Sequence, residues 1–146
     1  MRYILLFTAF FAISSSASDL SYLKKENPDE LGIWVFAGPS CPMTGKDVEG
    51  LVSGVLIRSR LKPKTSGWVS EPLYLEISVD CLALEGNNPV YTIVAGFGRF
   101  VPKPSIMYDK GYGTFGIGPK ESINRAIKNA TESAVTAYIQ ANFINN

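Results

Sequence analysis

The stretch Pro72-Leu-Tyr-Leu-Glu-Ile-Ser-Val-Asp-Cys-Leu-Ala83 decides how this chain is expected to fold. Apolar side chains from Leu73 to Cys81 alternate along it with mostly polar ones. Strict alternation over this length is the period of a β-strand that has one face in the core and the other toward water. We therefore expect a central strand at residues 72–83, with Cys81 on its inward face.

The sequence before the central strand predicts another strand and a helix. Residues 31–37 (Leu-Gly-Ile-Trp-Val-Phe-Ala) are apolar throughout, which is typical of a strand buried on both faces. After a loop rich in proline, Thr44 and Asp47 have the spacing of a helix-capping box. Apolar residues at helical spacing over residues 48–56 then predict an amphipathic helix, which ends by Lys62 because a proline follows.

A hairpin is predicted directly after the central strand. Residues 85–88 (Glu-Gly-Asn-Asn) predict its loop, and residues 90–101 predict the returning strand. Gly96 and Gly98 in that strand indicate a bulge or a close approach of another group to the backbone.

The carboxyl-terminal third predicts a loop, a strand and a helix. A loop over residues 102–110 leads to a glycine-rich last strand at residues 111–118, and Pro119 then opens a helix that runs to about Phe143. The resulting order is β-α-β-β-β-α. We therefore predict one domain over residues 31–146, an α+β two-layer sandwich whose mixed four-stranded sheet carries both helices on one face.

The amino terminus is typical of a secretory signal peptide. Arg2 precedes an apolar run at residues 3–13, and small residues follow up to a predicted cleavage after Ala17. That run is shorter than the ~20 residues a membrane-spanning helix needs. We therefore expect a periplasmic or secreted protein with no membrane span after cleavage, which begins with a loosely held polar leader at residues 18–30.

Composition excludes several function classes. Removing residues 1–17 removes one basic residue and no acid, and leaves 13 basic and 13 acidic residues. A neutral chain argues against nucleic acid as the partner. The chain has no histidine, which removes the usual general base, the Ser-His and Cys-His nucleophile pairs and most zinc sites. We expect no catalytic residues, no metal and no cofactor.

The two cysteines, Cys41 and Cys81, are predicted to form a disulfide. An exported protein folds in an oxidising compartment, where an even number of cysteines favours pairing. The closed loop of about 40 residues is worth roughly 4 kcal/mol in the chain-entropy model. Cys41 also follows a strand and opens a helix, the place where thioredoxin-like proteins keep their redox motif, so a thiol-dependent redox protein stays an alternative.

Three sets of side chains are candidates for binding or catalysis. Two carboxylates on the central strand, Glu76 and Asp80, would lie ~13 Å apart, farther than the paired carboxylates of glycosidases, so we expect a solvated face. A basic cluster complements the dipole of the first helix or binds an anionic partner: Arg58, Arg60, Lys62 and Lys64. The aromatic residues outnumber what a core needs, which favours a protein partner or, alternatively, a small apolar ligand carried between sheet and helices: Trp34, Trp68, Tyr74, Tyr91, Tyr108 and Tyr112.

Three stretches together resemble small exported bacterial proteins of unknown function. They are the helix at residues 47–60, the strand at residues 73–79 with its partner at residues 90–97, and Gly113-Thr-Phe-Gly-Ile-Gly with the long helix that ends Tyr138-Ile-Gln-Ala-Asn142. The order of elements is similar to the amino-terminal domain of the TolB translocation protein and to accessory domains of envelope assembly. The resemblance brings no catalytic residues with it. Because the sequence has no histidine, no nucleophile with a base and no metal cluster, but has many aromatic residues, we expect a non-enzymatic periplasmic or secreted module that acts in envelope assembly or binds a protein partner.

Overall fold

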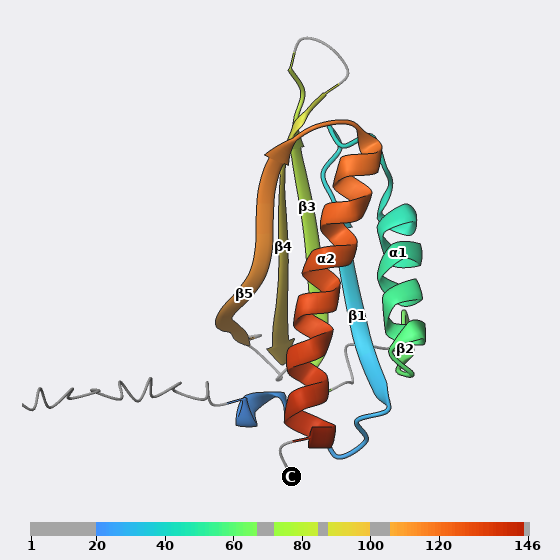
Figure 1. Cartoon of the computed structure of the whole chain (residues 1–146), viewed down its shortest axis with the longest axis vertical. Helices are drawn as coiled ribbons and strands as arrows, with labels where there is room; N and C mark the ends of the chain where they lie inside the picture. The colour runs from blue at the N-terminus through green and yellow to red at the C-terminus, as the bar shows by residue number, and fades with distance from the viewer. Residues whose placement is uncertain (1–19, 67–71, 85–87, 100–105, 145–146) are drawn as a thin grey trace, which may run out of the picture.

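The computed structural model describes residues 20–66, 72–84, 88–99 and 106–144. Five strands form one sheet in the order β2-β1-β3-β4-β5: β1 (Glu30–Ala37), β2 (Lys62–Lys64), β3 (Tyr74–Leu82), β4 (Val90–Arg99) and β5 (Ile106–Ile117). Two helices, α1 (Gly45–Arg58) and α2 (Lys120–Ile139), pack on one face of it (Figure 1). Short helical turns, η1 (Ser21–Leu23) and η3 (Gln140–Ile144), lie near the two ends. The predicted α+β two-layer architecture is confirmed.

The prediction of a four-stranded sheet is wrong, because β2 adds a strand beside β1. The helix α1 ends at Arg58, within the predicted limit of Lys62, and Arg60 then takes a left-handed conformation with φ of 61° that turns the chain back toward the sheet. Residues 62–64 pair parallel with β1. Their proline lacks a backbone donor, and a sheet tolerates such a residue at its edge.

The direction of the other strands follows the connections between them. The strands β1 and β3 are parallel, with Val35 opposite Ile77, as the intervening helix requires. The hairpin β3–β4 and the pair β4–β5 are antiparallel. A register irregularity between Gly96 and Gly98 confirms the predicted bulge.

The core lies between the sheet and the helices. Alternate side chains of β3 and of the residue before it are fully buried there, which confirms the predicted alternation of the apolar side chains: Leu73, Leu75, Ile77 and Val79. The helices cover them with their apolar stripes, including Val52 and Leu56 of α1 and Ile123 and Ile127 of α2.

Burial of β1 on both faces is wrong for its second half. Trp34 is 40% exposed and Phe36 is 47% exposed, whereas Leu31 and Ile33 are buried. The strand alternates like β3, because only one face of the sheet carries helices.

The last strand is longer than predicted. β5 begins at Ile106, so the loop predicted over residues 102–110 is wrong for its last five residues. Residues 106 and 107 pair with Arg99 and Gly98 beyond the bulge of β4. Several predicted features lie outside the described residues: the rest of that loop, residues 85–87 of the hairpin loop, Trp68 and the predicted signal peptide.

The polar stretch before β1 is anchored rather than loosely held. Leu23 is fully buried. The side chain of Asn142 accepts a hydrogen bond from the backbone of Lys25 (2.9 Å) and donates one to the backbone oxygen of Leu23 (2.9 Å). The hydroxyl of Tyr138 donates to the carbonyl of Pro28 (2.9 Å). Both ends of the described chain therefore meet at one pole of the molecule.

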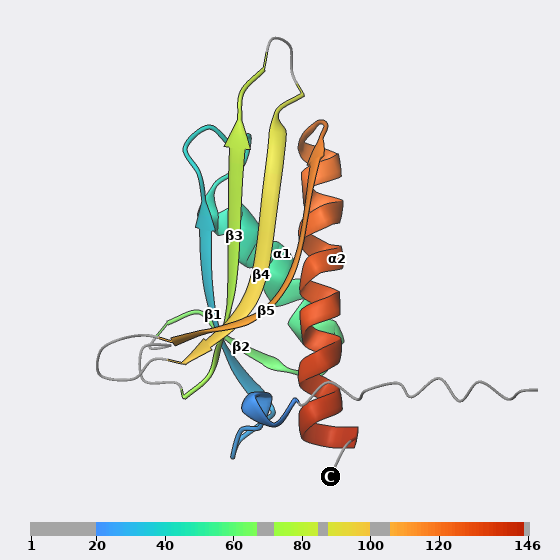
Figure 2. The same ribbon diagram turned by 90° about the vertical axis from the view of Figure 1, so that its left-hand side faces the viewer.

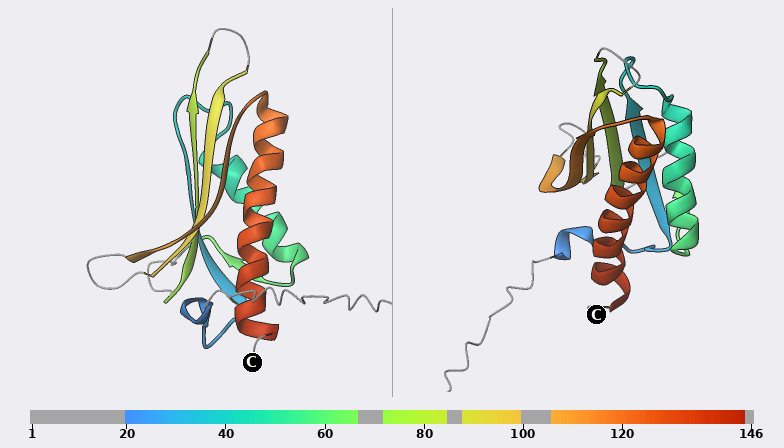
Figure 3. Two further views of the ribbon diagram at one scale, coloured as in Figure 1. Left: turned by 60° about the vertical axis from the view of Figure 1, so that its left-hand side comes forward. Right: turned by 45° about the horizontal axis from the view of Figure 1, so that its top comes forward.

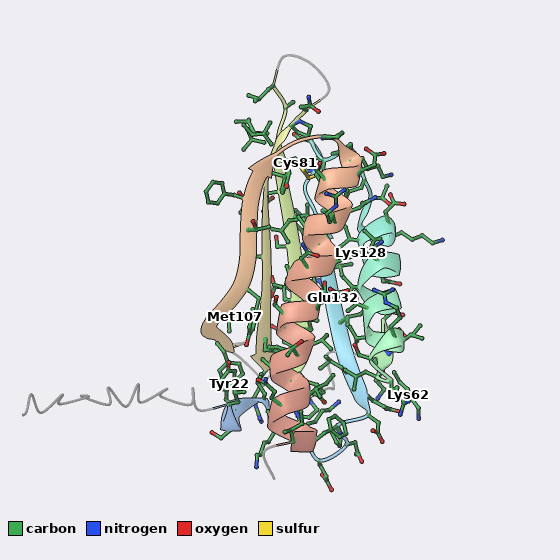
Figure 4. All side chains as sticks on the ribbon, viewed as in Figure 1. Tyr22, Lys62, Cys81, Met107, Lys128 and Glu132 are labelled. Atoms are coloured by element: carbon green, nitrogen blue, oxygen red, sulfur yellow. A yellow bond between two sulfur atoms is a disulfide. The ribbon has the colours of Figure 1, made fainter. Side chains whose placement is uncertain are left out.

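The predicted disulfide is confirmed. Cys41 and Cys81 are joined, with their Cα atoms 5.0 Å apart. The amide of Gly38 donates to the carbonyl of Val79 (2.8 Å), which continues the pairing of β1 with β3 and brings the loop after β1 to the end of β3. In Figure 4, Cys81 is labelled at the pole opposite the chain ends.

Candidate functional site: the open face of the sheet

The face of the sheet opposite the helices has no covering element among the described residues (Figure 2 and the left panel of Figure 3). We call it the open face. The register of the strands places these side chains on it: Trp34, Phe36, Tyr74, Glu76, Ser78, Asp80, Leu82, Thr92, Val94, Met107, Phe115 and Ile117.

Much of the open face is apolar although it is exposed. Phe36 lies in one row of the sheet with Ser78 and Val94, and Val94 is 50% exposed. Phe115 on β5 is 82% exposed. Single exposed apolar residues are common on soluble proteins, but several on one sheet face form a patch of the kind that binds partners.

A polar stripe on β3 crosses this patch. Glu76 lies between Trp34 of β1 and Gly96 of β4 in the register, and burial raises the pKa of its carboxyl. The hydroxyl of Ser78 donates to the carboxylate of Asp80 (3.4 Å). The open face therefore combines aromatic contact area with hydrogen-bonding groups.

One aromatic residue of β3 fills a gap in the sheet surface. Tyr74 was expected toward water, but it is 2% exposed and its ring lies against Gly98. A Cβ atom at Gly98 would be 2.6 Å from both Tyr74 and Met107. The hydroxyl of Tyr74 reaches the sulfur of Met107 (3.3 Å). Burial also raises the pKa of Tyr74.

The predicted basic cluster lies away from the open face, around the end of α1 and on β2. Arg58 pairs with Glu132 of α2 (3.5 Å). Lys62 and Lys64 both approach Glu30 of β1, at 4.0 and 3.3 Å. The remaining member of the cluster, Arg60, is exposed in the left-handed turn after α1.

Three of the six aromatic residues singled out in the sequence lie on the helix side of the sheet. Tyr91 is buried there, and Tyr108 packs against Tyr22, with ring centroids 4.5 Å apart. Tyr112 packs edge-on against Phe97, and burial raises its pKa to about 12.

Of the aromatic residues singled out, Trp34 is the one that the structure shows exposed on the open face. Sequence reasoning missed Phe36, Val94 and Phe115 as exposed side chains. The predicted two-layer fold was a signal that could have found Phe36, because both helices on one face leave the other face of the sheet uncovered.

The described part of the chain holds no cluster of three side chains able to bind a metal. Cys41 is in a disulfide, so this form of the protein has no thiol at that position. None of the described helices is both long and apolar enough to span a membrane.

Comparison with known proteins finds similar folds only. No protein-family model matches this chain, and no curated protein resembles it in sequence. The PelC dodecamer from Paraburkholderia phytofirmans has a TM-score of 0.51 at 10% identity, over 75% of this chain and 87% of that one. A PelC variant from the same organism gives 0.51 at 9% identity, over 75% and 86% of the two chains.

A more distant match is a minor lipoprotein from Acinetobacter baumannii, with a TM-score of 0.39 at 9% identity, over 77% of this chain and 90% of that one. At such identities the PelC match shows that the fold is shared and nothing more. The resemblance to TolB-type domains stays a hypothesis.

Proposed function

We propose that this protein is an exported, non-enzymatic accessory module that binds a protein partner through the open face, in the service of an assembly in the cell envelope. The observation that carries the proposal is the exposure of Trp34, Phe36 and Phe115 on a sheet face that no described element covers. Aromatic and polar groups side by side are the composition of protein interfaces.

Other features agree with this proposal. A disulfide is typical of proteins that fold outside the cytoplasm. The absence of histidine from the whole sequence supports a role without catalysis. The shared fold of PelC, which is a dodecamer, is an example of this architecture in a larger assembly. The open face is a better candidate than the basic cluster, where three of the four cations lie close to acids of the same chain.

Site-specific photocrosslinking in the native host tests the proposal. A photoreactive phenylalanine analogue replaces Phe36 on the open face or, as the matched control, Ile57, which is 62% exposed on α1. We expect a discrete cross-linked product from the first position and none from the second. The mass of that product tells a different protein from a second copy of this chain.

Loss of affinity completes the test once the partner is known. Removing a central aromatic side chain from an interface costs ~2 kcal/mol or more, which is at least about 30-fold in affinity. Trp34→Ala is expected to weaken binding by that factor, whereas Ile57→Ala leaves it unchanged. Equal binding of the two variants, or equal crosslinking from both positions, contradicts the proposal.

A further inference from the structure

The outer edge of β5 is unprotected, unlike the opposite edge of the sheet. Sheets usually shield their edges by shortness, proline or charge. The opposite edge, β2, has three residues that include Pro63 and two lysines. From Gly111 to Ile117, β5 has seven residues with neither proline nor a charged side chain, and no described strand pairs with its outer side.

The hydrogen-bonding direction of β5 follows from its connection to α2. The amide of Gly118 donates to the carbonyl of Pro89 (3.2 Å), and this pair continues the register in which Ile117 lies opposite Val90. In an antiparallel ladder, successive residues turn their backbone groups alternately toward and away from the partner strand. The backbone groups of Ile117, Phe115 and Gly113 therefore point away from β4, toward the free edge.

A groove runs between this edge and α2. It has a volume of about 610 Å³. Gly113, Thr114 and Ile117 line it on the side of β5. A stripe of α2 at helical spacing faces them: Ser122, Arg125, Asn129 and Ser133. Figures 1 and 2 both show β5 beside α2, so strand edge and helix form the two walls.

The walls of the groove define the chemistry of an occupant. Arg125 is the one charged residue among the described side chains that line it, and no acid lies there to pair with it. The other lining residues of α2 are three with short polar side chains, Ser122, Asn129 and Ser133, and two alanines, Ala126 and Ala130. An extended peptide with an acidic side chain satisfies both the outward backbone groups of β5 and the guanidinium of Arg125. Of these backbone groups, the carbonyl of Phe115 also accepts a long hydrogen bond from the hydroxyl of Thr114 (3.4 Å).

We propose that this groove binds an extended acidic segment of a partner protein, which pairs with β5 as a further strand and places a carboxylate opposite Arg125. Strand addition gives affinity through main-chain hydrogen bonds and specificity through alternate side chains. The site lies at the sheet edge, where Phe115 and Ile117 also border the open face. It goes beyond the function proposed above because its binding groups are the outward backbone groups of β5 and the side chain of Arg125.

Selection from a phage-displayed library of random dodecapeptides on the exported protein tests the proposal. We expect enriched peptides that carry an acidic residue and no proline in the paired segment. Their binding to the whole protein is then measured by fluorescence anisotropy. A library that yields no peptide above background overturns the proposal.

Substitution of Phe115 isolates the backbone contribution. Phe115→Pro removes an amide that points outward and leaves the ladder with β4 in place, whereas Phe115→Ala removes only the exposed side chain. Loss of an interfacial hydrogen bond costs ~1.4 kcal/mol, so the proline variant is expected to bind about 10-fold more weakly than the alanine variant. Equal affinities of the two variants overturn strand addition.

Substitution of Arg125 isolates the charge. Arg125→Gln is expected to weaken binding about 10-fold, and the same loss follows from replacing the acid of the peptide by its amide. Lys128→Gln is the matched control, because Lys128 is a cation of the same helix that does not line the groove. It lies one helical turn before Glu132, on the side of α2 that faces α1. Figure 4 labels Lys128 and Glu132 on α2. Equal affinities of Arg125→Gln and Lys128→Gln overturn the assignment of the carboxylate.

Hydrogen exchange gives a readout that needs no variant. Bound peptide is expected to slow exchange of the amides of Gly113, Phe115 and Ile117 while leaving those of Thr114 and Gly116 as they are, because the latter already bond to β4. Uniform slowing along β5, or none, contradicts the proposal. Sedimentation of the free protein tests whether a second copy of this chain occupies the β5 edge instead. An oligomer that dissociates in the Phe115→Pro variant overturns the proposal.

Discussion

Glu76 illustrates how much the environment of a residue depends on its neighbours in the sheet. Its carboxylate belongs to the polar stripe on β3, yet it is half-buried beside Trp34. Asp80, four residues later in the same stripe, is exposed. Burial disfavours the charged form and raises the pKa of Glu76.

The raised pKa makes Glu76 a source of pH-dependent stability. A carboxyl whose pKa is higher in the folded state destabilises the fold once pH exceeds its unfolded value, about 4.3. Glu76→Gln is therefore expected to raise the melting temperature at pH 7, and this gain is lost as pH falls through the folded pKa toward 4. Thermal denaturation across this range measures it. Glu26→Gln, on the exposed segment before β1, is the control, and a gain independent of pH contradicts the prediction.

At the scale of elements, α1 shows a local sequence signal that the fold uses as expected. The hydroxyl of Thr44 accepts from the amide of Asp47 (3.3 Å), and the carboxylate of Asp47 accepts from the amide of Thr44 (2.8 Å). The second bond lowers the pKa of Asp47. The capping box predicted from the sequence is confirmed.

Removal of this cap tests its contribution. Thr44→Ala is expected to lower the free energy of unfolding by about 1 kcal/mol, because an amide of the first turn loses its acceptor. Thr136→Ala is the matched control, since the hydroxyl of Thr136 bonds to a carbonyl inside α2 and caps nothing. Urea denaturation compares the two, and equal losses contradict the capping role.

Elements whose apolar residues repeat at a regular spacing were predictable from the sequence. Elements that form only because a neighbouring strand offers an edge were not. β3 and the two helices follow patterns of two or of three to four residues over eight positions or more. β2 has three residues and exists because β1 offers an edge. The exposure of Trp34 and Phe36 depends on how many layers the fold has, and a wholly apolar stretch does not contain that information.

At the scale of the whole molecule, the disulfide is a covalent cross-link between segments far apart in the sequence. It joins the loop that enters α1 to the end of the central strand. Loss of the cross-link frees a loop of 40 residues in the unfolded chain, which costs ~4 kcal/mol in the chain-entropy model.

The stability of cysteine variants measures how much the disulfide contributes to the free energy of unfolding. Cys41→Ser, Cys81→Ser and the double variant are expected to lose the same stability, since each breaks the same bond. Reductant should lower the melting temperature of the wild type and leave the double variant unchanged. Two titratable thiols in protein isolated without reductant contradict the prediction and favour a redox role for Cys41.

The meeting of the two chain ends at one pole has a consequence for the timing of folding. The bonds from Asn142 to Lys25 and Leu23 join residues 117 and 119 positions apart in sequence. Contacts of such long separation form late, after the loop between them has closed. Synthesis proceeds from the amino terminus, so these bonds cannot form until Asn142 has left the ribosome. The segment before β1 therefore reaches its native place only after α2 has been made.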